Sequence, residues 1–205
     1  MSINFEVRQA GRGGVQLRCR QAGFTLIELM ITITIASVLM ALAISKLQTP
    51  KTSSESNSLL NMLQLARAAA VKQGQVVIVC PSANPTAAAP TCSTSANWAT
   101  GWIVLAPASP PASPCTATGG AAGDLVLQTQ QALTSGDTAN FTTTGANTAF
   151  CFTRYGLAYA AYTGIVQFDT SPANLARRRC LAVSGVGHMQ VLTHGQSDAL
   201  GVACP

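Results

Sequence analysis

The chain has little charge and few of the side chains that perform catalysis. Only 9% of its 205 residues are charged, and only two are histidines. It contains no G-x-S-x-G motif and no P-loop, and His188 and His194 are not spaced as a metal-binding pair. The other candidate catalytic side chains, cysteines aside, are four aspartates, Asp124, Asp137, Asp169 and Asp198. We therefore expect no enzyme, no cofactor and no bound metal.

The net charge of +5 is misleading as a sign of nucleic-acid binding. Residues 1–23 hold four arginines and one glutamate, whereas the rest of the chain holds eight basic and six acidic residues. Such a balance does not predict a general cationic surface. The low charge and the abundance of alanine, threonine, serine and glycine favour an extracytoplasmic, β-rich domain over a cytosolic enzyme.

An apolar segment follows the basic leader and contains one carboxylate. Residues 24–44 span 21 positions, enough for a helix of roughly 32 Å, about the thickness of a bilayer core. The leader's arginines predict that the N-terminus stays in the cytoplasm. Glu28 lies five residues into the segment, where an unpaired charge is costly, so it requires a partner.

Two ordinary interpretations of this segment compete with a specialised one. Ala41-Leu42-Ala43 is a candidate cleavage site for a secretory signal peptide, although the apolar run is longer than usual and contains Glu28. A plain single-pass anchor with an incidental glutamate is the second alternative.

Six of the seven cysteines lie downstream of the apolar segment, and Cys19 lies in the leader. An even number in an exported domain indicates disulfides, with fifteen connectivities open, while the absence of a C-x-x-C pair makes zinc unattractive. The preferred pairing is a guess that closes one local loop and ties the C-terminus to a nearby strand: Cys80 with Cys92, Cys115 with Cys151, and Cys180 with Cys204.

The remainder predicts one helix and several short strands. Pro50 should break or kink a continuous helix, Thr52-Ser53-Ser54-Glu55 has the form of a capping box, and Gly74 is a suitable stop. Between them an apolar stripe recurs at helical spacing: Leu59, Met62, Leu63, Ala66, Ala69 and Ala70. Strands are expected at 76–79, 102–105, 125–131, 139–144, 148–154, 164–169, 176–183, 187–193 and 199–203.

The segment Gly23-Phe24-Thr25-Leu26-Ile27-Glu28 resembles the signal of type IV pilins and type II secretion pseudopilins. The resemblance implies that prepilin peptidase cuts between Gly23 and Phe24, and that Phe24 is then N-methylated. It also implies that Glu28 pairs with the terminal amine of a neighbouring subunit during filament assembly.

Further motifs resemble the GspH/FimT group of minor pilins. They are the segment 65–74 (LARAAAVKQG), the strand that ends in Cys80, Gly101-Trp102-Ile103-Val104, and the segment 177–185 (RRRCLAVSG). The resemblance implies an α+β, type IV pilin-like fold, in which a small antiparallel domain of two sheets packs on the second half of a long helix. The expected parts are a cleaved leader (1–23), a transmembrane and filament-core helix (24–49), its amphipathic continuation (50–74) and a periplasmic β-rich domain (75–205).

The implied function is structural. The chain would help to initiate or cap a type IV pilus or a type II secretion pseudopilus. Expected partners are other major and minor pilins or pseudopilins, prepilin peptidase and the inner-membrane assembly platform. The expected location is the inner membrane, with the globular domain in the periplasm, and then the filament tip. Neither the machine nor the neighbouring subunits follow from the sequence.

The alternative is a DNA-binding pilus tip for natural transformation, because FimT-like subunits contact DNA through arginines near their C-terminus. Arg177, Arg178 and Arg179 are the candidates here, and Arg154, His188 and His194 could join them. Such a patch would bind phosphates without sequence preference. The competing interpretation is a solvated edge strand, and residues 184–188 lack the arginines that DNA-binding members carry there.

Overall fold

A computed structural model gives the fold for residues 25–47, 51–108, 115–116, 119–134, 136–142, 147–198 and 201–205. The chain divides into two compact units, one ending at Lys46 and the other beginning at Leu47. The first contains helix α1 (Leu26–Leu47) apart from its last residue, and the second, here called the head, contains all the other elements. The leader and its proposed cleavage point lie outside the described residues.

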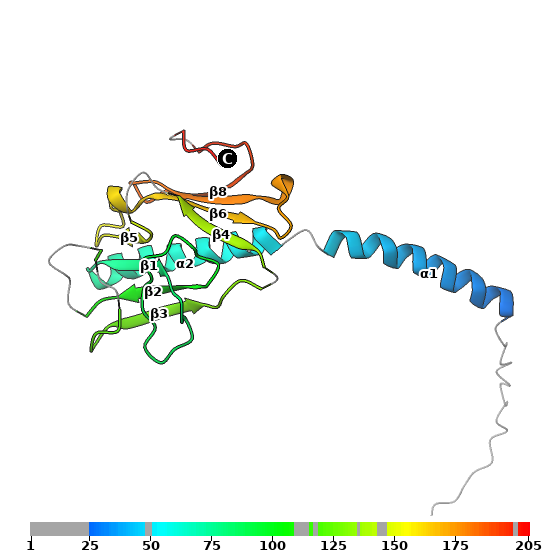
Figure 1. Cartoon of the computed structure of the whole chain (residues 1–205), viewed down its shortest axis with the longest axis horizontal. Helices are drawn as coiled ribbons and strands as arrows, with labels where there is room; N and C mark the ends of the chain where they lie inside the picture. Colours follow the sequence, from blue (N-terminus) through cyan, green and yellow to red (C-terminus); the bar gives the residue numbers. More distant parts are fainter. Residues whose placement is uncertain are drawn as a thin grey trace, which may run out of the picture. The chain divides into compact units, whose positions relative to one another are not determined.

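Helix α2 (Lys51–Gln73) runs through the head and packs its predicted stripe on both sheets (Figure 1). Leu59, Met62 and Leu63 are fully buried. The helix ends at Gln73 and is followed by Gly74, whose φ of +66° suits glycine. The capping box predicted at Thr52 was wrong: α2 begins at Lys51, and the Thr52 hydroxyl donates across the head to the Arg177 carbonyl oxygen at 2.6 Å.

The predicted strands form two four-stranded antiparallel sheets (Figure 1). Sheet A has the order β3-β2-β1-β5, and its strands are β1 (Val77–Pro81), β2 (Trp102–Ala106), β3 (Leu125–Gln130) and β5 (Phe150–Phe152). Sheet B has the order β4-β6-β7-β8, and its strands are β4 (Thr138–Thr142), β6 (Gly164–Asp169), β7 (Arg179–Val183) and β8 (Met189–Thr193). The α+β class with two small sheets is therefore confirmed.

Two strand predictions needed correction. The strand expected from residue 176 begins only at Arg179, because Leu175–Arg177 form a short 3-10 helix in which the Asn174 side chain accepts a hydrogen bond from the amide of Ala176. The strand expected at 199–203 is not seen in the described part of that range, where Ala203 makes an isolated bridge with Ser197.

The main core lies between α2 and the facing sides of the sheets. Its centre is aromatic: Trp98 packs against Phe150 at 5.5 Å between ring centroids, and Phe141 meets Phe150 edge-on at 5.0 Å. The indole N–H of Trp102 lies 3.1 Å from the sulfur of Met62, which ties sheet A to the helix. Gly101, which directly precedes β2, lets the chain lie against the end of β3, since a Cβ there would lie 2.5 Å from the carbonyl oxygen of Gln130.

The outer faces of both sheets are also covered. Alternate residues of β1 and β2, among them Ile78 and Ile103, pack with cysteines on the outside of sheet A. On sheet B a third cluster joins side chains of the strands, which are Ile165, Cys180, Ala182 and Leu192, to Cys204 of the C-terminal segment. Burial on two sides explains why β1 and β2 are continuous apolar runs.

The three disulfides join Cys80 to Cys92, Cys115 to Cys151, and Cys180 to Cys204, the same pairs that the sequence analysis prefers. All of them lie on the outer faces of the sheets. They fix the long loops and the C-terminal segment to the strands beneath.

Candidate assembly and binding sites

Glu28 lies in the first turn of α1, next to a helix cap that the sequence analysis missed. The amide of Glu28 donates to the Thr25 hydroxyl at 3.2 Å, and the amide of Leu29 donates to the Thr25 carbonyl. Thr25-Leu26-Ile27-Glu28 thus has the T-x-x-E spacing of a capping box, a signal that is readable from the sequence. An acidic residue at this end is favoured by the helix dipole.

The rest of α1 between Thr25 and Ser37 satisfies its own polar atoms. The hydroxyls of Thr32, Thr34 and Ser37 donate to backbone carbonyls three residues earlier, at 2.8–2.9 Å. The carboxylate of Glu28 has no partner among the described residues. It is therefore the polar group of this segment that remains to be matched by something outside the helix.

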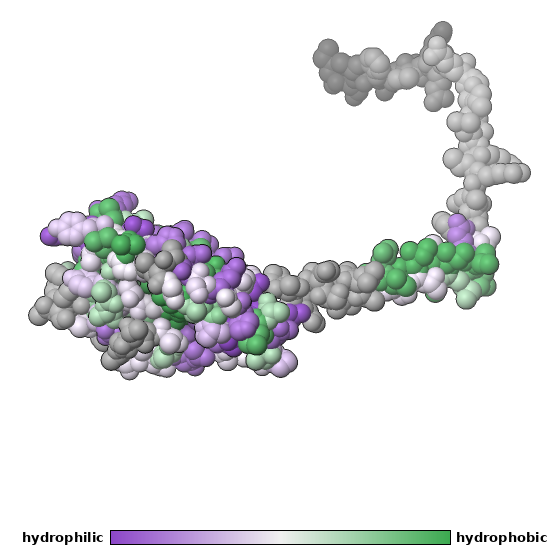
Figure 2. Space-filling view, turned by 90° about the horizontal axis from the view of Figure 1, so that it is seen from above, coloured by the Kyte–Doolittle hydropathy of each residue, from purple (hydrophilic) through white to green (hydrophobic). Residues whose placement is uncertain are grey.

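The apolar side chains of α1 are exposed over the part of the helix whose side chains are described, and Figure 2 shows one such face. Leu26 is 79% exposed, Ile31 53% and Leu39 61%, so no side of the described segment is polar enough to suit water. A helix that is apolar all round needs an apolar environment. Among the residues described, no helix has both the length and the apolar character needed to cross a membrane.

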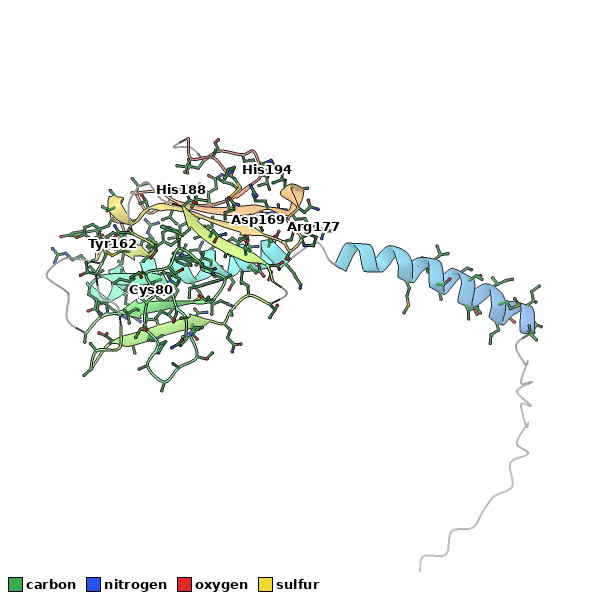
Figure 3. All side chains as sticks on the ribbon, viewed as in Figure 1. Cys80, Tyr162, Asp169, Arg177, His188 and His194 are labelled. Atoms are coloured by element: carbon green, nitrogen blue, oxygen red, sulfur yellow. A yellow bond between two sulfur atoms is a disulfide. The ribbon has the colours of Figure 1, made fainter. Side chains whose placement is uncertain are left out.

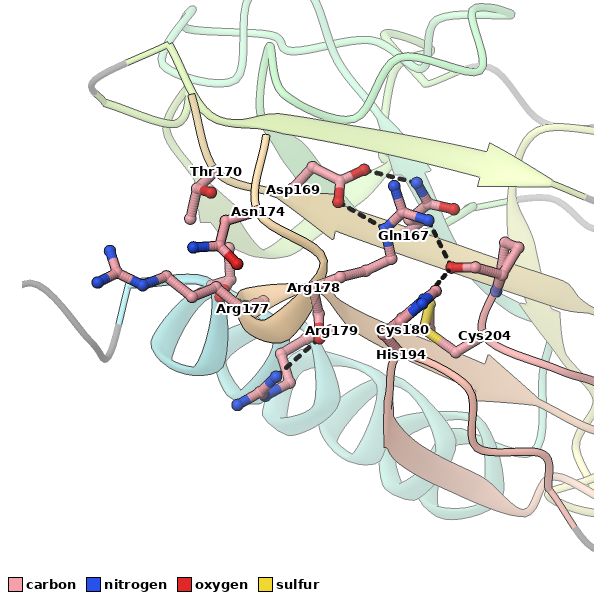
Figure 4. Close-up of polar contacts among 12 residues, drawn as sticks. Gln167, Asp169, Thr170, Asn174, Arg177, Arg178, Arg179, Cys180, His194 and Cys204 are labelled. Carbon is pink, nitrogen blue, oxygen red and sulfur yellow. Dashed lines mark hydrogen bonds and ion pairs between the residues drawn. A yellow bond between two sulfur atoms is a disulfide. The ribbon is translucent and has the colours of Figure 1, made fainter. Parts of the chain in front are cut away.

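The three consecutive arginines have different environments (Figure 4). Arg178 is ion-paired with Asp169 at 2.7 Å, and both side chains are less than one fifth exposed. Its guanidinium also donates to the Pro205 carbonyl oxygen, which His194 Nδ1 contacts at 2.8 Å. Arg179 donates to the carbonyl oxygens of Ala176 and Arg178. Arg178 thus links β7, the end of β6 and the C-terminal segment.

The other cations proposed for this cluster do not all join it. His194 does, through Pro205, but His188 lies at the opposite end of sheet B from Arg177 (Figure 3). Arg154 lies with the His188 end, because the 153–158 turn hydrogen-bonds to the β7–β8 turn through Ala158 and Gly185. Arg154 also stacks over the ring of Tyr155, with its guanidinium carbon 4.9 Å from the ring centroid.

No metal-binding group of histidine, cysteine, aspartate or glutamate is found in the described ranges. All six downstream cysteines are in disulfides.

Comparisons with known proteins give two matches to family models. Residues 55–187 match the family described as type II transport protein GspH, and residues 18–44 match the prokaryotic N-terminal methylation motif. No curated protein sequence matches the chain.

The similar solved structures include those of two proteins. One is the type IV minor pilin FimU of Pseudomonas aeruginosa, with 18% identity and a TM-score of 0.47, covering 68% of this chain and 91% of that one. The other is the minor pseudopilin EpsH of the Vibrio cholerae type 2 secretion system, with 11% identity and a TM-score of 0.48, covering 71% and 99%.

Proposed function

Because this chain belongs to the GspH family of minor pilins and pseudopilins and carries its N-terminal methylation motif, we propose that it is a structural subunit that initiates or caps a filament. The filament is a type IV pilus or a type II secretion pseudopilus. The family is structural, and the proposal assigns no catalytic activity to the chain.

The observation that carries the proposal is that the Glu28 carboxylate has no partner among the described residues, whereas the hydroxyls of Thr32, Thr34 and Ser37 bond within the same apolar helix. In a bilayer this charge is expensive, and in a filament a positive group can offset it. Cleavage after Gly23 creates such a group, the N-methylated amine of Phe24. Glu28 of one subunit then pairs with the amine of Phe24 on a neighbour.

The same proposal sets the life history of the subunit. The arginine-rich leader stays cytoplasmic, α1 enters the inner membrane, and the head folds in the periplasm, where its disulfides form. Prepilin peptidase removes residues 1–23, and the inner-membrane platform moves the mature subunit into contact with other pilins or pseudopilins, at the filament tip.

Glu28→Gln tests this role. We expect the variant to be processed and inserted normally, with mass spectrometry showing an N-terminal methyl-Phe24, but to be depleted at least about tenfold from sheared filaments. The reason is that glutamine keeps the size of the side chain and loses the charge that pairs with the amine. Thr32→Val is the matched control, since it removes a polar group of α1 that bonds only within its own helix.

Normal filament incorporation of Glu28→Gln would overturn the pairing role. Finding the mature N-terminus near residue 44 instead of at Phe24 would favour the ordinary signal peptide.

A deletion strain separates the two machines. If the subunit serves a pilus, twitching is lost and secretion of type II substrates is kept, and the reverse holds for a pseudopilus. Retention of both phenotypes would contradict assembly in either machine.

DNA contact through Arg177, Arg178 and Arg179 stays the alternative prediction. We do not advance it, because the Arg178 guanidinium is already paired with Asp169 and bonded to the Pro205 carbonyl oxygen. The Arg179 guanidinium likewise donates to the nearby carbonyl oxygen of Arg178. A mobility-shift assay at low salt with all three replaced by alanine tests it directly.

A further inference from the structure

A groove of about 620 Å³ opens between the second half of α2 and the turn that joins β7 to β8. Its apolar lining includes Ala68, Val71 and Met189, and its cationic lining comprises Arg67 and Lys72, with His188 beside them. No acidic residue lines it. The groove lies within the head, so its shape does not depend on the placement of α1.

Backbone contacts hold the groove in shape. The guanidinium of Arg67 donates to the Gly187 carbonyl oxygen at 3.0 Å, which fixes the β7–β8 turn to the helix. A Cβ at Gly187 would lie 2.6 Å from the Gly156 carbonyl oxygen, so glycine is required for the two turns to approach each other. The site is therefore preformed, which lowers the entropic cost of binding.

The charge at this end of the head is uncompensated. Arg67 and Lys72 line the groove, and Arg154 is carried by the adjoining 153–158 turn. None of the three has a carboxylate partner among the described residues. By contrast, Glu55, Asp137 and Asp169 belong to the opposite ends of α2 and sheet B. An acidic ligand would therefore meet these three cations at the groove end without a competing carboxylate beside them.

Apolar side chains are exposed around the same groove. Val71 is 54% exposed, Val186 of the β7–β8 turn 65%, and Tyr155 of the adjoining turn 70%. Gly156 places that turn against α2, since a Cβ on it would lie 3.2 Å from both Val71 Cγ2 and Arg67 Nε. Apolar residues bordered by cations are typical of a protein-binding surface.

We propose that this groove binds an acidic polypeptide segment that carries apolar side chains, supplied by another protein. An apolar side chain of the ligand occupies the space beside Ala68, Val71 and Met189, and its carboxylates meet Lys72, Arg154 and the fork of Arg67. The binding does not require filament assembly, so it stands or falls separately from the proposed function.

A polynucleotide fits the groove less well. Single-stranded nucleic acids bind by stacking bases on exposed aromatic faces along a cationic track. Here Tyr155 is the exposed aromatic residue near the groove, and Arg154 already covers one face of its ring. The apolar lining consists of Ala68, Val71 and Met189, which suit leucine-like side chains, and His188 is the one aromatic ring in the lining.

The test uses the full chain in detergent and fluorescence anisotropy with three labelled probes. They are a short peptide alternating glutamate and leucine, its lysine and leucine counterpart, and oligothymidylate. We expect the acidic peptide to bind and the basic one not to bind. The double variant Lys72→Glu/Arg154→Glu should weaken acidic-peptide binding by about tenfold or more.

Arg177→Glu/Arg179→Glu is the matched control, because it changes the net charge equally at the other end of sheet B, and it should leave binding unchanged. Val71→Ser adds a variant without a charge change and should also weaken binding. The proposal fails if the acidic peptide does not bind, if the two double variants weaken it equally, or if oligothymidylate competes more strongly than the acidic peptide.

Discussion

At the residue scale, Glu55 is the side chain whose environment most conflicts with its charge. Its Oε2 atom is buried and has no hydrogen-bond partner among the described residues. Burial raises the pKa of Glu55, the nearby Asp137 raises it further, and Lys51 lowers it in part. The folded head therefore holds this proton more tightly than the unfolded chain does.

This difference gives stability a defined pH dependence. The contribution of Glu55 is least unfavourable below the ordinary glutamate pKa and becomes destabilising as pH rises through the higher pKa of the folded state. Glu55→Gln removes the titratable group and leaves a neutral side chain of similar size. We expect urea unfolding at neutral pH to give a free energy of unfolding higher than wild type by less than about 1 kcal/mol, because Glu55 is only partly buried and solvent screens its charge.

The gain should shrink toward zero in acid, where Glu55 itself is protonated. A gain that is equal at both pH values would mean that packing, and not charge, causes it.

At the element scale, α2 is stabilised by one side only. Leu59, Leu63, Ala66 and Ala70 are fully buried against the sheets, while Leu65 on the same helix is 40% exposed. Two leucines separated by one residue therefore have different energetic roles.

Leu63→Ala should lower the free energy of unfolding by about 2–5 kcal/mol, because it removes buried methyl groups and leaves a cavity. Leu65→Ala should change it by less than about 1 kcal/mol, since the side chain is largely hydrated in the folded state. Chemical denaturation of both variants checks this. Equal losses would place Leu65 in the core and contradict the packing described here.

Helix α2 was predictable because periodicity is a local property, and its stripe appears at the expected residues. Most strands were predictable for the same reason. Pairing was not: β5 follows β4 in the chain but joins sheet A, and nothing in Phe150–Phe152 indicates its partner. The role of Thr52 was also hidden, because its hydrogen-bond acceptor lies 125 residues away.

At the scale of the whole molecule, the head is a small domain held by three cross-links in addition to its core. The cysteine pairs are separated by 12, 36 and 24 residues along the chain, in order from the N-terminus. In the chain-entropy account, a longer closed loop gives greater stabilisation. Each disulfide also holds a loop or the C-terminal segment against the outer face of a sheet.

Replacing one cysteine pair at a time by alanine should therefore give graded losses. We expect about 4 kcal/mol for Cys115–Cys151, about 3.5 for Cys180–Cys204 and about 3 for Cys80–Cys92. Urea unfolding of the three oxidised variants measures the order. A reversed order would show that the contacts of these covering segments contribute more to the free energy of unfolding than the loop-closure entropy does.

Because Thr32, Thr34 and Ser37 form their hydrogen bonds inside α1, these side chains do not need hydrogen-bond partners from the medium around the helix. These three hydroxyls bond within the helix, so none of them has to exchange a hydrogen bond when the apolar medium around the helix changes. The solvation free energy of these side chains should therefore differ little between a lipid environment and an apolar protein environment. If the segment moves from membrane to filament as proposed, the free-energy difference between the two environments rests largely on one ionised group, Glu28.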